Sequence, residues 1–352
     1  MAAPPRILFL DDDQVLRLLR MLLRNEEAQD SFAAWFAPEQ VDLSDVLAQL
    51  NGLRHSEGAL AGLASQEPQL QTDADAIVLR RGVVDEALLS KHPRLRVVVR
   101  LGERPEGIDL EATQRHGARV ICVPRATLHY TAEHALLLML ASGKRLLQAD
   151  SAVRAGAVDA QGNAASAGTI AYNWVGLSDA SGLHGRTLGI VGLGEVGSLV
   201  ARLALAFGMQ VLYTKPRRAS AVQEKGLGVA YANLPDLLYS CDYVSLHAPD
   251  LPETQHLANS QFFATMKRGA VFVNTSRGSL VQEDALYEAL ASGHLAGAGL
   301  DVHAFEPCSP GDRFLSLPNV VMTPHLGGGA RSGVLREFAA MATQIRLALH
   351  LG

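Results

Sequence analysis

The segment that decides the fold is RTLGIVGLGEVG, residues Arg186–Gly197. An apolar run typical of a buried strand ends at Val191, and a helical pattern begins inside the glycine-rich turn that follows. In this order Gly192 permits a tight turn, Gly194 lets the backbone approach a pyrophosphate, and Gly197 lets the helix pack closely on the strand. The helix N-terminus adds free N–H groups and a positive dipole end. We therefore predict a dinucleotide site formed by Gly192, Gly194, Glu195, Val196 and Gly197.

The next strand indicates which dinucleotide is preferred. NAD-selective sites usually place an acidic residue about 20 residues further on, where it holds the ribose 2′-hydroxyl. Here the predicted strand Gln210–Thr214 is followed by a cationic turn, and no acidic residue stands at that place. A carboxylate would repel a 2′-phosphate, whereas arginine can bind one through two hydrogen bonds. We therefore expect NADP to be preferred over NAD, with contacts from Thr214, Lys215, Arg217 and Arg218. The alternative is a basic turn that is merely solvated.

The same rhythm of short apolar runs and helical patterns extends along most of the chain. In the first third, strand-like runs such as Ile7–Leu10 and Ala76–Leu79 alternate with helical stretches. A long apolar helix is predicted over Thr131–Leu147, and the Ala-, Ser- and Gly-rich stretch Asp150–Leu183 reads as a loop insertion with one short helix at most. The alternation then restarts at Arg186. This order is typical of parallel sheets with helices on both faces, so an α/β fold with two doubly wound parallel-sheet domains is expected.

Composition excludes several classes of protein. The chain has 352 residues, of which 48% are hydrophobic and 19% charged, which favours a folded globular protein over a disordered one. Lysine and arginine number 31 against 36 acidic residues, giving a net charge of −5 that argues against a general nucleic-acid binder. The longest apolar run, Ala135–Ser142, is too short to cross a bilayer. Three distant cysteines with no metal-binding spacing favour a reducing compartment, so a cytoplasmic protein without metal is expected.

The N-terminus offers a competing interpretation. The segment ILFLDDDQVLRLLRMLL (7–23) is similar to the opening of a response-regulator receiver domain, in which acidic residues after the first strand bind Mg²⁺. Such a domain needs a phospho-accepting aspartate some forty residues further on, and the stretch Asn51–His55 contains none. We therefore expect an ordinary strand-to-helix turn in which Asp12 or Asp13 caps the helix.

Four further segments follow the glycine motif in order. They are SLHAPDLPETQHL (245–257), MKRGAVFVNTSRGSLVQEDAL (266–286), GAGLDVHAFEP (297–307) and LPNVVMTPHLGG (317–328). With these motifs the chain resembles the D-isomer-specific 2-hydroxyacid dehydrogenase family, in particular its glyoxylate and hydroxypyruvate reductases. The resemblance runs from Asp73 to the C-terminus and is loose over residues 1–70. It implies a Rossmann cofactor domain over residues 125–325, inserted into a flavodoxin-like substrate domain of residues 1–124 and 326–352.

Three residues have the chemistry that 2-oxo acid reduction needs. Arg277 follows a predicted strand, Ala270–Asn274, at the edge where ligands bind in open α/β sheets, and its guanidinium can hold a carboxylate. Of the twelve histidines, His325 is the one that matches a family catalytic motif. By resemblance it is the general acid in reduction and the base in oxidation, while Glu306 favours the imidazolium and orients the ring.

The resemblance also assigns the cofactor pocket and the assembly. Asp301 matches an acid near the nicotinamide carboxamide, and its alternative role is a hydrogen-bonding residue at a strand end. Further cofactor contacts are expected from His247, Ala248, Pro249, Thr254, Thr275 and Ser276. Family members usually form dimers through the cofactor domain, so a homodimer with a small 2-oxo or 2-hydroxy acid as ligand, and with neither nucleic acid nor membrane as partner, is implied.

Two segments depart from the family pattern. Where the family's substrate loop usually reads GVGVDNID, this chain has GERPEGID from Gly102 to Asp109, so Arg104 replaces a glycine. By resemblance the loop residues Gly102, Glu103 and Arg104 hold the substrate carboxylate. A second segment keeps Glu133 and His134 but has Arg125 in place of a glycine. These arginines suggest a substrate with a second anionic group, unless they point to solvent.

Other members of the same fold remain as alternatives. Formate dehydrogenases pair the histidine with glutamine, so Glu306 argues against them. Phosphite dehydrogenases keep all three catalytic residues, and a substrate assay must separate them. A dinucleotide-sensing corepressor would bind the cofactor without turnover. A phosphoglycerate dehydrogenase with an additional regulatory domain is not expected, because the chain ends just after its final helix.

Overall fold

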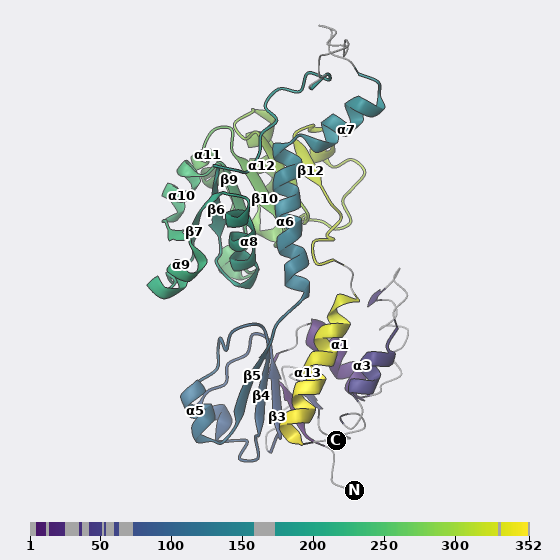
Figure 1. Ribbon diagram of the computed structural model, residues 1–352, viewed down its shortest axis with the longest axis vertical. Helices are drawn as coiled ribbons and strands as arrows, with labels where there is room; N and C mark the ends of the chain where they lie inside the picture. The colour runs from purple at the N-terminus through teal and green to yellow at the C-terminus, as the bar shows by residue number, and fades with distance from the viewer. Residues whose placement is uncertain are drawn as a thin grey trace, which may run out of the picture. The chain divides into compact units, whose positions relative to one another are not determined.

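The structure is a computed structural model that describes residues 5–11, 14–24, 35–36, 42–50, 53, 60–62, 73–157, 173–329 and 332–350. Within it the chain forms two compact units (Figure 1). Unit 1 comprises Met1–Thr127 and Gly329–Gly352, and unit 2 comprises Leu128–Gly328. The middle of the sequence therefore folds as one unit, and the two ends of the chain form the other.

Unit 1 contains a parallel sheet with strand order β2-β1-β3-β4-β5. This 2-1-3-4-5 order is that of flavodoxin-like folds. Its strands are β1 (Ile7–Phe9), β2 (Leu60–Gly62), β3 (Ala76–Leu79), β4 (Val97–Leu101) and β5 (Arg119–Val123). Its helices are α1 (Gln14–Arg24), α3 (Ser44–Gln49), α4 (Glu86–Leu89), α5 (Leu110–Arg115) and α13 (Gly333–Leu349).

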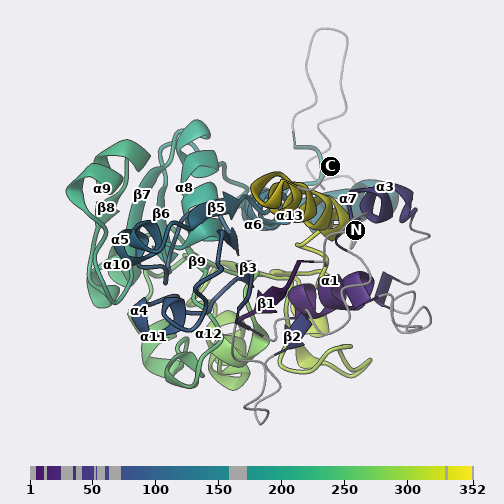
Figure 2. The same cartoon turned by 90° about the horizontal axis from the view of Figure 1, so that it is seen from below.

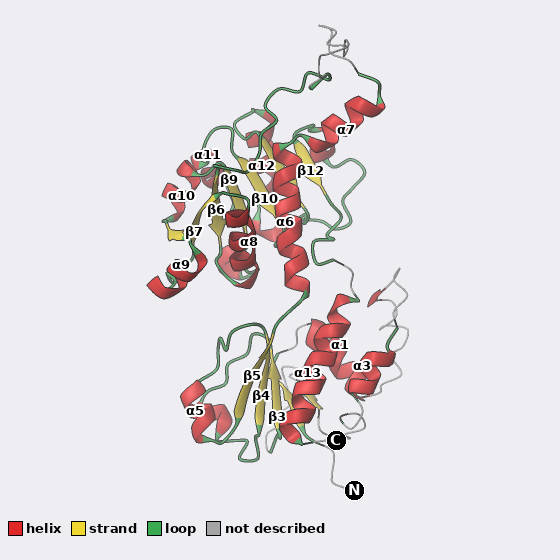
Figure 3. Cartoon of the chain, in the orientation of Figure 1, coloured by secondary structure: helices red, strands yellow, loops and turns green. Residues whose placement is uncertain are grey.

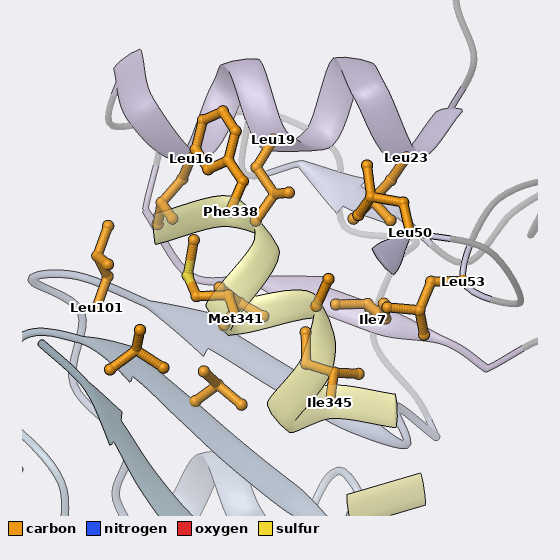
Figure 4. Close-up of a cluster of buried hydrophobic side chains, with 14 of the residues drawn as sticks. Ile7, Leu16, Leu19, Leu23, Leu50, Leu53, Leu101, Phe338, Met341 and Ile345 are labelled. Carbon is orange, nitrogen blue, oxygen red and sulfur yellow. The ribbon is translucent and has the colours of Figure 1, made fainter. Parts of the chain in front are cut away.

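The core of unit 1 explains why the C-terminal helix belongs to it. Phe338, Met341 and Ile345 on one face of α13 are buried among residues of α1 and of the sheet (Figure 4). Successive residues of a strand point to opposite faces, so Val97 packs under α13 while Val98 packs under α4 and α5. Both faces of this sheet are thus covered, which suits its nearly continuous apolar strands.

Unit 2 contains a larger parallel sheet with strand order β12-β11-β10-β9-β6-β7-β8. Its strands are β6 (Thr187–Val191), β7 (Gln210–Thr214), β8 (Ala230–Tyr231), β9 (Tyr243–Leu246), β10 (Val271–Asn274), β11 (Gly297–Leu300) and β12 (Val320–Met322). Counted from β6, the order is 3-2-1-4-5-6 with one more strand at the end, which is the Rossmann arrangement. The strand order reverses direction between β6 and β9, where such sheets bind ligands.

Two groups of helices cover this sheet (Figures 1 and 2). One face packs on α6 (Thr127–Gly143) and α8 (Glu195–Ala206), with α9 (Ala221–Leu227) beside them. The other face packs on α10 (Leu234–Ser240), α11 (Ser260–Thr265) and α12 (Glu283–Ala291). Short 3-10 turns η1 (Pro252–Thr254), η2 (Gly278–Leu280) and η3 (Arg313–Ser316) complete the unit. The expected fold, two doubly wound parallel sheets with a Rossmann domain inserted into a flavodoxin-like one, is confirmed.

The long helix expected over Thr131–Leu147 is wrong in its extent. The chain forms α6, then a break, then α7 (Leu146–Arg154), which are separate helices in Figure 3. Arg145 has a φ of +52°, a left-handed conformation that no α-helix continues through. At Gly143 an added Cβ would overlap the Tyr243 hydroxyl, so the end of α6 lies against the sheet. The apolar periodicity of the sequence continues through this break, so it does not predict where α6 ends.

The acidic turn after β1 is only partly described. Asp12 and Asp13, the expected helix caps, lie outside the described residues. The Asp11 carboxylate accepts hydrogen bonds from the amides of Arg80 at 2.7 Å and Arg81 at 3.1 Å. This residue therefore ties β1 to the end of β3.

Candidate active site

The three candidate catalytic residues follow the carboxyl ends of three neighbouring strands. Arg277 follows β10, Glu306 lies on the segment after β11, and His325 follows β12. These strands are adjacent and parallel, so their carboxyl ends meet at one edge of the sheet in unit 2. Residues separated by up to 48 positions (325 − 277) in the sequence are therefore brought to the same edge.

His325 and Glu306 form a direct pair. The ring Nδ1 of His325 donates to Oε2 of Glu306 at 2.6 Å, and both side chains are partly exposed, 43% and 35%. Burial raises the pKa of Glu306, but hydrogen bonds from His325 and from the amide of His303, with the histidine charges, outweigh it and lower the pKa. Glu306 is thus a carboxylate at neutral pH, and with Nδ1 engaged, Nε2 is the nitrogen that can exchange a proton with a ligand.

The segment that carries Glu306 is held by hydrogen bonds at its start. The Glu306 carboxylate accepts from the amide of His303 at 3.0 Å, and the amide of Ala304 donates to Glu283 on α12 at 2.9 Å. Glu283 stands in the quoted motif, but nothing in the sequence marked it as a support for this loop. These bonds limit the positions that the Glu306 carboxylate can take.

Arg277 lies on a turn that side chains stabilise from within. Asn274, buried at the end of β10, accepts from the amide of Ser276 at 2.9 Å and donates to the carbonyl of Arg277 at 2.9 Å. The Arg277 side chain is exposed, and one guanidinium nitrogen donates to the Ser276 carbonyl at 2.6 Å. A guanidinium has five N–H donors, so most of them remain for a ligand.

Glycine at position 278 brings the Arg277 turn and the Glu306 segment together. A Cβ added there would overlap the carbonyl of His303, and would lie 2.5 Å from the amide nitrogen of Ala304. Only glycine therefore allows this backbone contact. It places the start of the Glu306 segment directly against the turn that presents Arg277.

Asp301 lies at the end of β11 and is 1% exposed. Its carboxylate accepts from the Thr323 hydroxyl at 2.6 Å and from the amides of Leu326 at 2.9 Å and Gly327 at 2.8 Å. Burial raises the pKa of Asp301, but hydrogen bonds from His134, Thr323 and these amides outweigh it and bring the pKa to about 2. These contacts match the alternative role given in the sequence analysis, that of a hydrogen-bonding residue at a strand end.

The glycine motif has the geometry that phosphate binding requires. Gly192 has a φ of +106°, and a Cβ there would lie 2.6 Å from the carbonyl of His247, at the point where β6 and β9 diverge. A Cβ on Gly197 would overlap the carbonyl of Gly192. At Gly194, the N-cap of α8, a Cβ would meet nothing within 4 Å, so the helix start faces open space. These residues fit a dinucleotide pyrophosphate.

The cationic turn after β7 is organised by an acid that sequence reasoning missed. Glu224 on α9 accepts from Arg218 at 2.8 and 3.0 Å and from the Tyr213 hydroxyl at 2.6 Å. These hydrogen bonds, that from Arg218 first, lower the pKa of Glu224 to about 2. Arg218 is therefore engaged within the protein, whereas Arg217 is exposed and Lys215 lies 3.5 Å from the Leu193 carbonyl of the glycine motif. Glu224 lies six positions beyond Arg218 on a helix, where no local motif identifies it.

The remaining cofactor candidates lie at the same sheet edge. His247 follows β9 and contacts Ser245 through Nε2 at 2.9 Å, and burial lowers its pKa to about 4, so it is neutral at pH 7. Ala248 and Pro249 follow it, and Thr254 donates to the Pro249 carbonyl at 2.6 Å. Ser276 donates to the Leu246 carbonyl at 2.7 Å.

Thr275 is a candidate contact for a bound ligand. It is buried, and its hydroxyl has no hydrogen-bond partner among the residues that the structure describes. Because an unpaired buried hydroxyl is costly, a bound group that pairs with it would be favoured. Thr275 lies between Asn274 and Ser276, at the expected position for a cofactor contact.

The expected substrate loop belongs to unit 1. Gly102, Glu103 and Arg104 follow β4, and the buried Arg100 of that strand donates to the Arg104 carbonyl. Arg100 also pairs with Glu106 at 3.3 Å. The loop is thus tied to its own strand by an arginine that the sequence analysis did not consider.

Arg125 also lies in unit 1, where it faces an acid. Its Nε lies 3.6 Å from the carboxylate of Glu337 on α13, and the two side chains are 11% and 1% exposed. The same carboxylate accepts from the amide and the hydroxyl of Thr127 at 3.1 and 2.6 Å. Glu337 was not recognised from the sequence, because an acid on an amphipathic terminal helix usually faces water.

In the described ranges no group of three or more His, Cys, Asp or Glu side chains is arranged to hold a metal ion. No helix in the described part of the chain combines the length and the apolarity needed to cross a bilayer.

Comparisons with known proteins find several relatives of this chain. A sequence model of the D-isomer specific 2-hydroxyacid dehydrogenase, NAD binding domain, matches residues 136–327. D-3-phosphoglycerate dehydrogenase of Mycobacterium leprae is 37% identical over 79% of this chain and 49% of its own length, so this chain spans about half of that relative. Glyoxylate reductase of Korarchaeum cryptofilum is 39% identical over 72% of this chain and 73% of its own length.

A solved structure extends the likeness to both units. Apo D-mandelate dehydrogenase of Rhodotorula graminis is 27% identical, covers 97% of this chain with 94% of its own, and has a TM-score of 0.60. The family match covers more than half of the chain and includes the NAD-binding Rossmann unit. The chain is therefore a member of the D-isomer specific 2-hydroxyacid dehydrogenase family.

Proposed function

We propose that this protein reduces a 2-oxo acid to a D-2-hydroxy acid with a nicotinamide dinucleotide, and that the reaction is reversible. The observation that carries the proposal is the 2.6 Å hydrogen bond between His325 and Glu306, beside the strand that presents Arg277. Glyoxylate reductases of similar length, such as that of Korarchaeum cryptofilum, support the same class of reaction. When bound at this edge of unit 2, the reduced nicotinamide supplies the hydride.

Each of the three residues has one task in the proposal. Arg277 binds the carboxylate and the carbonyl oxygen of the substrate through guanidinium N–H groups that the protein leaves exposed. His325 gives a proton from Nε2 to the carbonyl oxygen as the substrate carbon is reduced. Glu306 holds Nδ1, fixes the ring orientation and stabilises the imidazolium before the transfer. In oxidation the same histidine takes the hydroxyl proton.

The residues of the glycine motif would hold the dinucleotide. The helix start at Gly194 faces open space and suits the pyrophosphate, while the unpaired hydroxyl of Thr275 suits a polar group further along the cofactor. Unit 2 is thus the cofactor domain in this proposal. Unit 1 is the substrate domain, and its loop Gly102–Arg104 provides further contacts to the substrate carboxylate.

We propose NADP as the preferred cofactor. Lys215 and Arg217 are the cations of the turn after β7 that can meet a 2′-phosphate, since Arg218 is paired with Glu224. A double variant, Lys215→Asp with Arg217→Ala, should shift the kcat/KM ratio of NADPH to NADH toward NADH by about tenfold or more, because each charge-assisted bond contributes about 1.5–3 kcal/mol. An unchanged kcat/KM ratio would refute the proposed role of Lys215 and Arg217 in cofactor preference.

Arg104 is the candidate for a second anionic group on the substrate. Arg125 is less suited, because its guanidinium already lies beside the buried Glu337. Replacing Arg104 by alanine should raise KM for phosphonopyruvate or oxaloacetate more than for glyoxylate. Equal effects on the KM values of all three acids would show that Arg104 does not bind the second anionic group.

The decisive experiment is a substrate panel. Glyoxylate, hydroxypyruvate, aryl pyruvates, phosphonopyruvate and oxaloacetate are tested with NADH and with NADPH, following the loss of reduced-nicotinamide absorbance. The Arg277→Ala variant should lose at least about 100-fold in kcat/KM, since it removes a charged anchor. Arg268→Ala is the matched control, because Arg268 is exposed before β10, at the strand's opposite end. Near-normal turnover of Arg277→Ala would refute the anchor.

Two other outcomes of the panel would change the proposal. Turnover with phosphite and with none of the 2-oxo acids would make the protein a phosphite-type dehydrogenase that uses the same three residues. Tight NADH binding without turnover of any substrate would favour a dinucleotide-sensing, corepressor-like protein.

We also propose that the protein forms a homodimer through unit 2. Its helices α6 and α7 expose Leu137, Leu146, Leu147 and Val153, and exposed large apolar side chains favour burial against a partner. Light scattering coupled to gel filtration should give a mass near 75 kDa, twice that of the 37.6 kDa chain. A mass of one chain at micromolar concentration would rule the dimer out.

A further inference from the structure

The backbone at His325 is in an unfavourable conformation. Its φ is +52°, in the left-handed region that non-glycine residues rarely adopt. Such a conformation persists where surrounding contacts impose it, and at a functional site it fixes where the side chain points. The contacts around residues 323–327 therefore decide the orientation of the His325 ring.

Asp301 makes four of those contacts. Its carbonyl accepts from the amide of His325 at 2.8 Å. Its carboxylate accepts from the amides of Leu326 and Gly327 and from the hydroxyl of Thr323. One buried aspartate thus binds the chain before, at and after the proposed proton donor.

His134 of α6 also belongs to this hydrogen-bond network. Its Nε2 lies 2.9 Å from the Thr323 hydroxyl and 3.3 Å from Oδ1 of Asp301, and the residue is 6% exposed. The Thr323 hydroxyl has a single proton, which it donates to Asp301. His134 must therefore be the donor to Thr323, so its Nε2 carries a proton.

The ring of His134 is also packed against the loop. A Cβ added to Gly327 would lie 3.3 Å from Cδ2 of His134 and 2.7 Å from Oδ2 of Asp301. The neighbouring residues Ala135, Leu138 and Met139 of α6 are fully buried in the core of unit 2. The network is thus anchored on a helix that the core holds in place.

We propose that His134 is a positioning residue for the reaction: it donates to Thr323, supports Asp301, and through them holds the His325 loop in its productive conformation. The role of His325 as proton donor is taken from the proposed function. Its geometric consequence, an ordered His325 beside Glu306, is independent of which substrate the enzyme uses.

The first test compares three variants of the 352-residue chain. His134→Leu removes the donor and fills the space, His134→Gln keeps an N–H donor, and His129→Leu changes an exposed histidine of the same helix as a control. We expect His134→Leu to lower kcat by about 10- to 100-fold, with KM values for substrate and cofactor changed by less than about threefold. His134→Gln should recover most of the loss, and His129→Leu should match the wild type.

A second pair of variants guards against a folding defect at position 134. Thr323→Val breaks the bonds to both His134 and Asp301 with almost no change of shape, whereas Thr323→Ser keeps the hydroxyl. We expect Thr323→Val to reproduce the kcat loss and Thr323→Ser to retain activity. If His134→Leu or Thr323→Val keeps kcat within about twofold of the wild type, the proposal is wrong.

A third readout does not depend on activity. The rate at which diethylpyrocarbonate modifies His325, measured by mass spectrometry of its peptide, reports how firmly the ring is held. We expect a several-fold faster rate in His134→Leu and Thr323→Val and an unchanged rate in His134→Gln and His129→Leu. If the wild type reduces no 2-oxo acid, the proposed function fails, and these rates still decide the positioning role: equal rates in all variants overturn it.

Discussion

Replacing Asp301 by asparagine should destabilise unit 2 in a pH-dependent way. The structure lowers the pKa of this carboxyl from 3.8 to about 2, against a burial effect that alone would raise it. The shift of about 1.8 units corresponds to about 2 kcal/mol that the ionised form contributes to folding. Asparagine has nearly the same shape but no charge, and its amide nitrogen cannot accept from the backbone. The free energy of unfolding at pH 7 should therefore fall by about 2 kcal/mol.

The sign of the pH dependence separates charge from shape. A lowered folded-state pKa stabilises above the unfolded value of 3.8 and loses this effect as pH falls through the folded value of about 2. Urea denaturation followed by circular dichroism should thus show the difference between wild type and Asp301→Asn shrinking between pH 5 and pH 2. Glu288→Gln, a change at an exposed acid of the same unit, is the control, with an effect below about 0.5 kcal/mol. A difference that stays constant with pH would refute the electrostatic reasoning.

Three further changes have expected outcomes. Gly278→Ala should lower kcat sharply while cofactor binding, measured by fluorescence titration, stays near normal, because its Cβ would push the backbone of His303 away from the Arg277 turn. Glu306→Gln should lower the rate of reduction by about 100-fold, because a neutral amide does not stabilise the imidazolium; a rate within threefold of wild type would contradict the pairing. Glu224→Gln should release the cationic turn, and kinetics should show a higher KM for NADPH with kcat unchanged.

The sequence determined the architecture because its signals are local. Burial on both faces requires continuous apolar runs in parallel strands, and β3 and β7 span the ranges that were expected from such runs. The glycines of the nucleotide motif are equally local, since each satisfies a turn or a close contact within its own strand–turn–helix segment.

The sequence did not predict where helix α6 ends. The break after α6 is set by the contact between Gly143 and Tyr243, which lie a hundred positions apart, and by the left-handed Arg145. Neither leaves a mark in the apolar periodicity, which continues through both helices.

Only the tertiary structure decided which hydrogen-bond and ion-pair partners the charged and polar groups have. Arg218 was expected to meet a cofactor phosphate, but its guanidinium pairs with Glu224 on the next helix. Likewise the bonds of His134 to Thr323 and Asp301 join residues up to 189 positions apart (323 − 134). A hydrogen bond requires two atoms within about 3 Å, and for distant residues that proximity is set by the stacking order of strands and helices, which no residue specifies by itself.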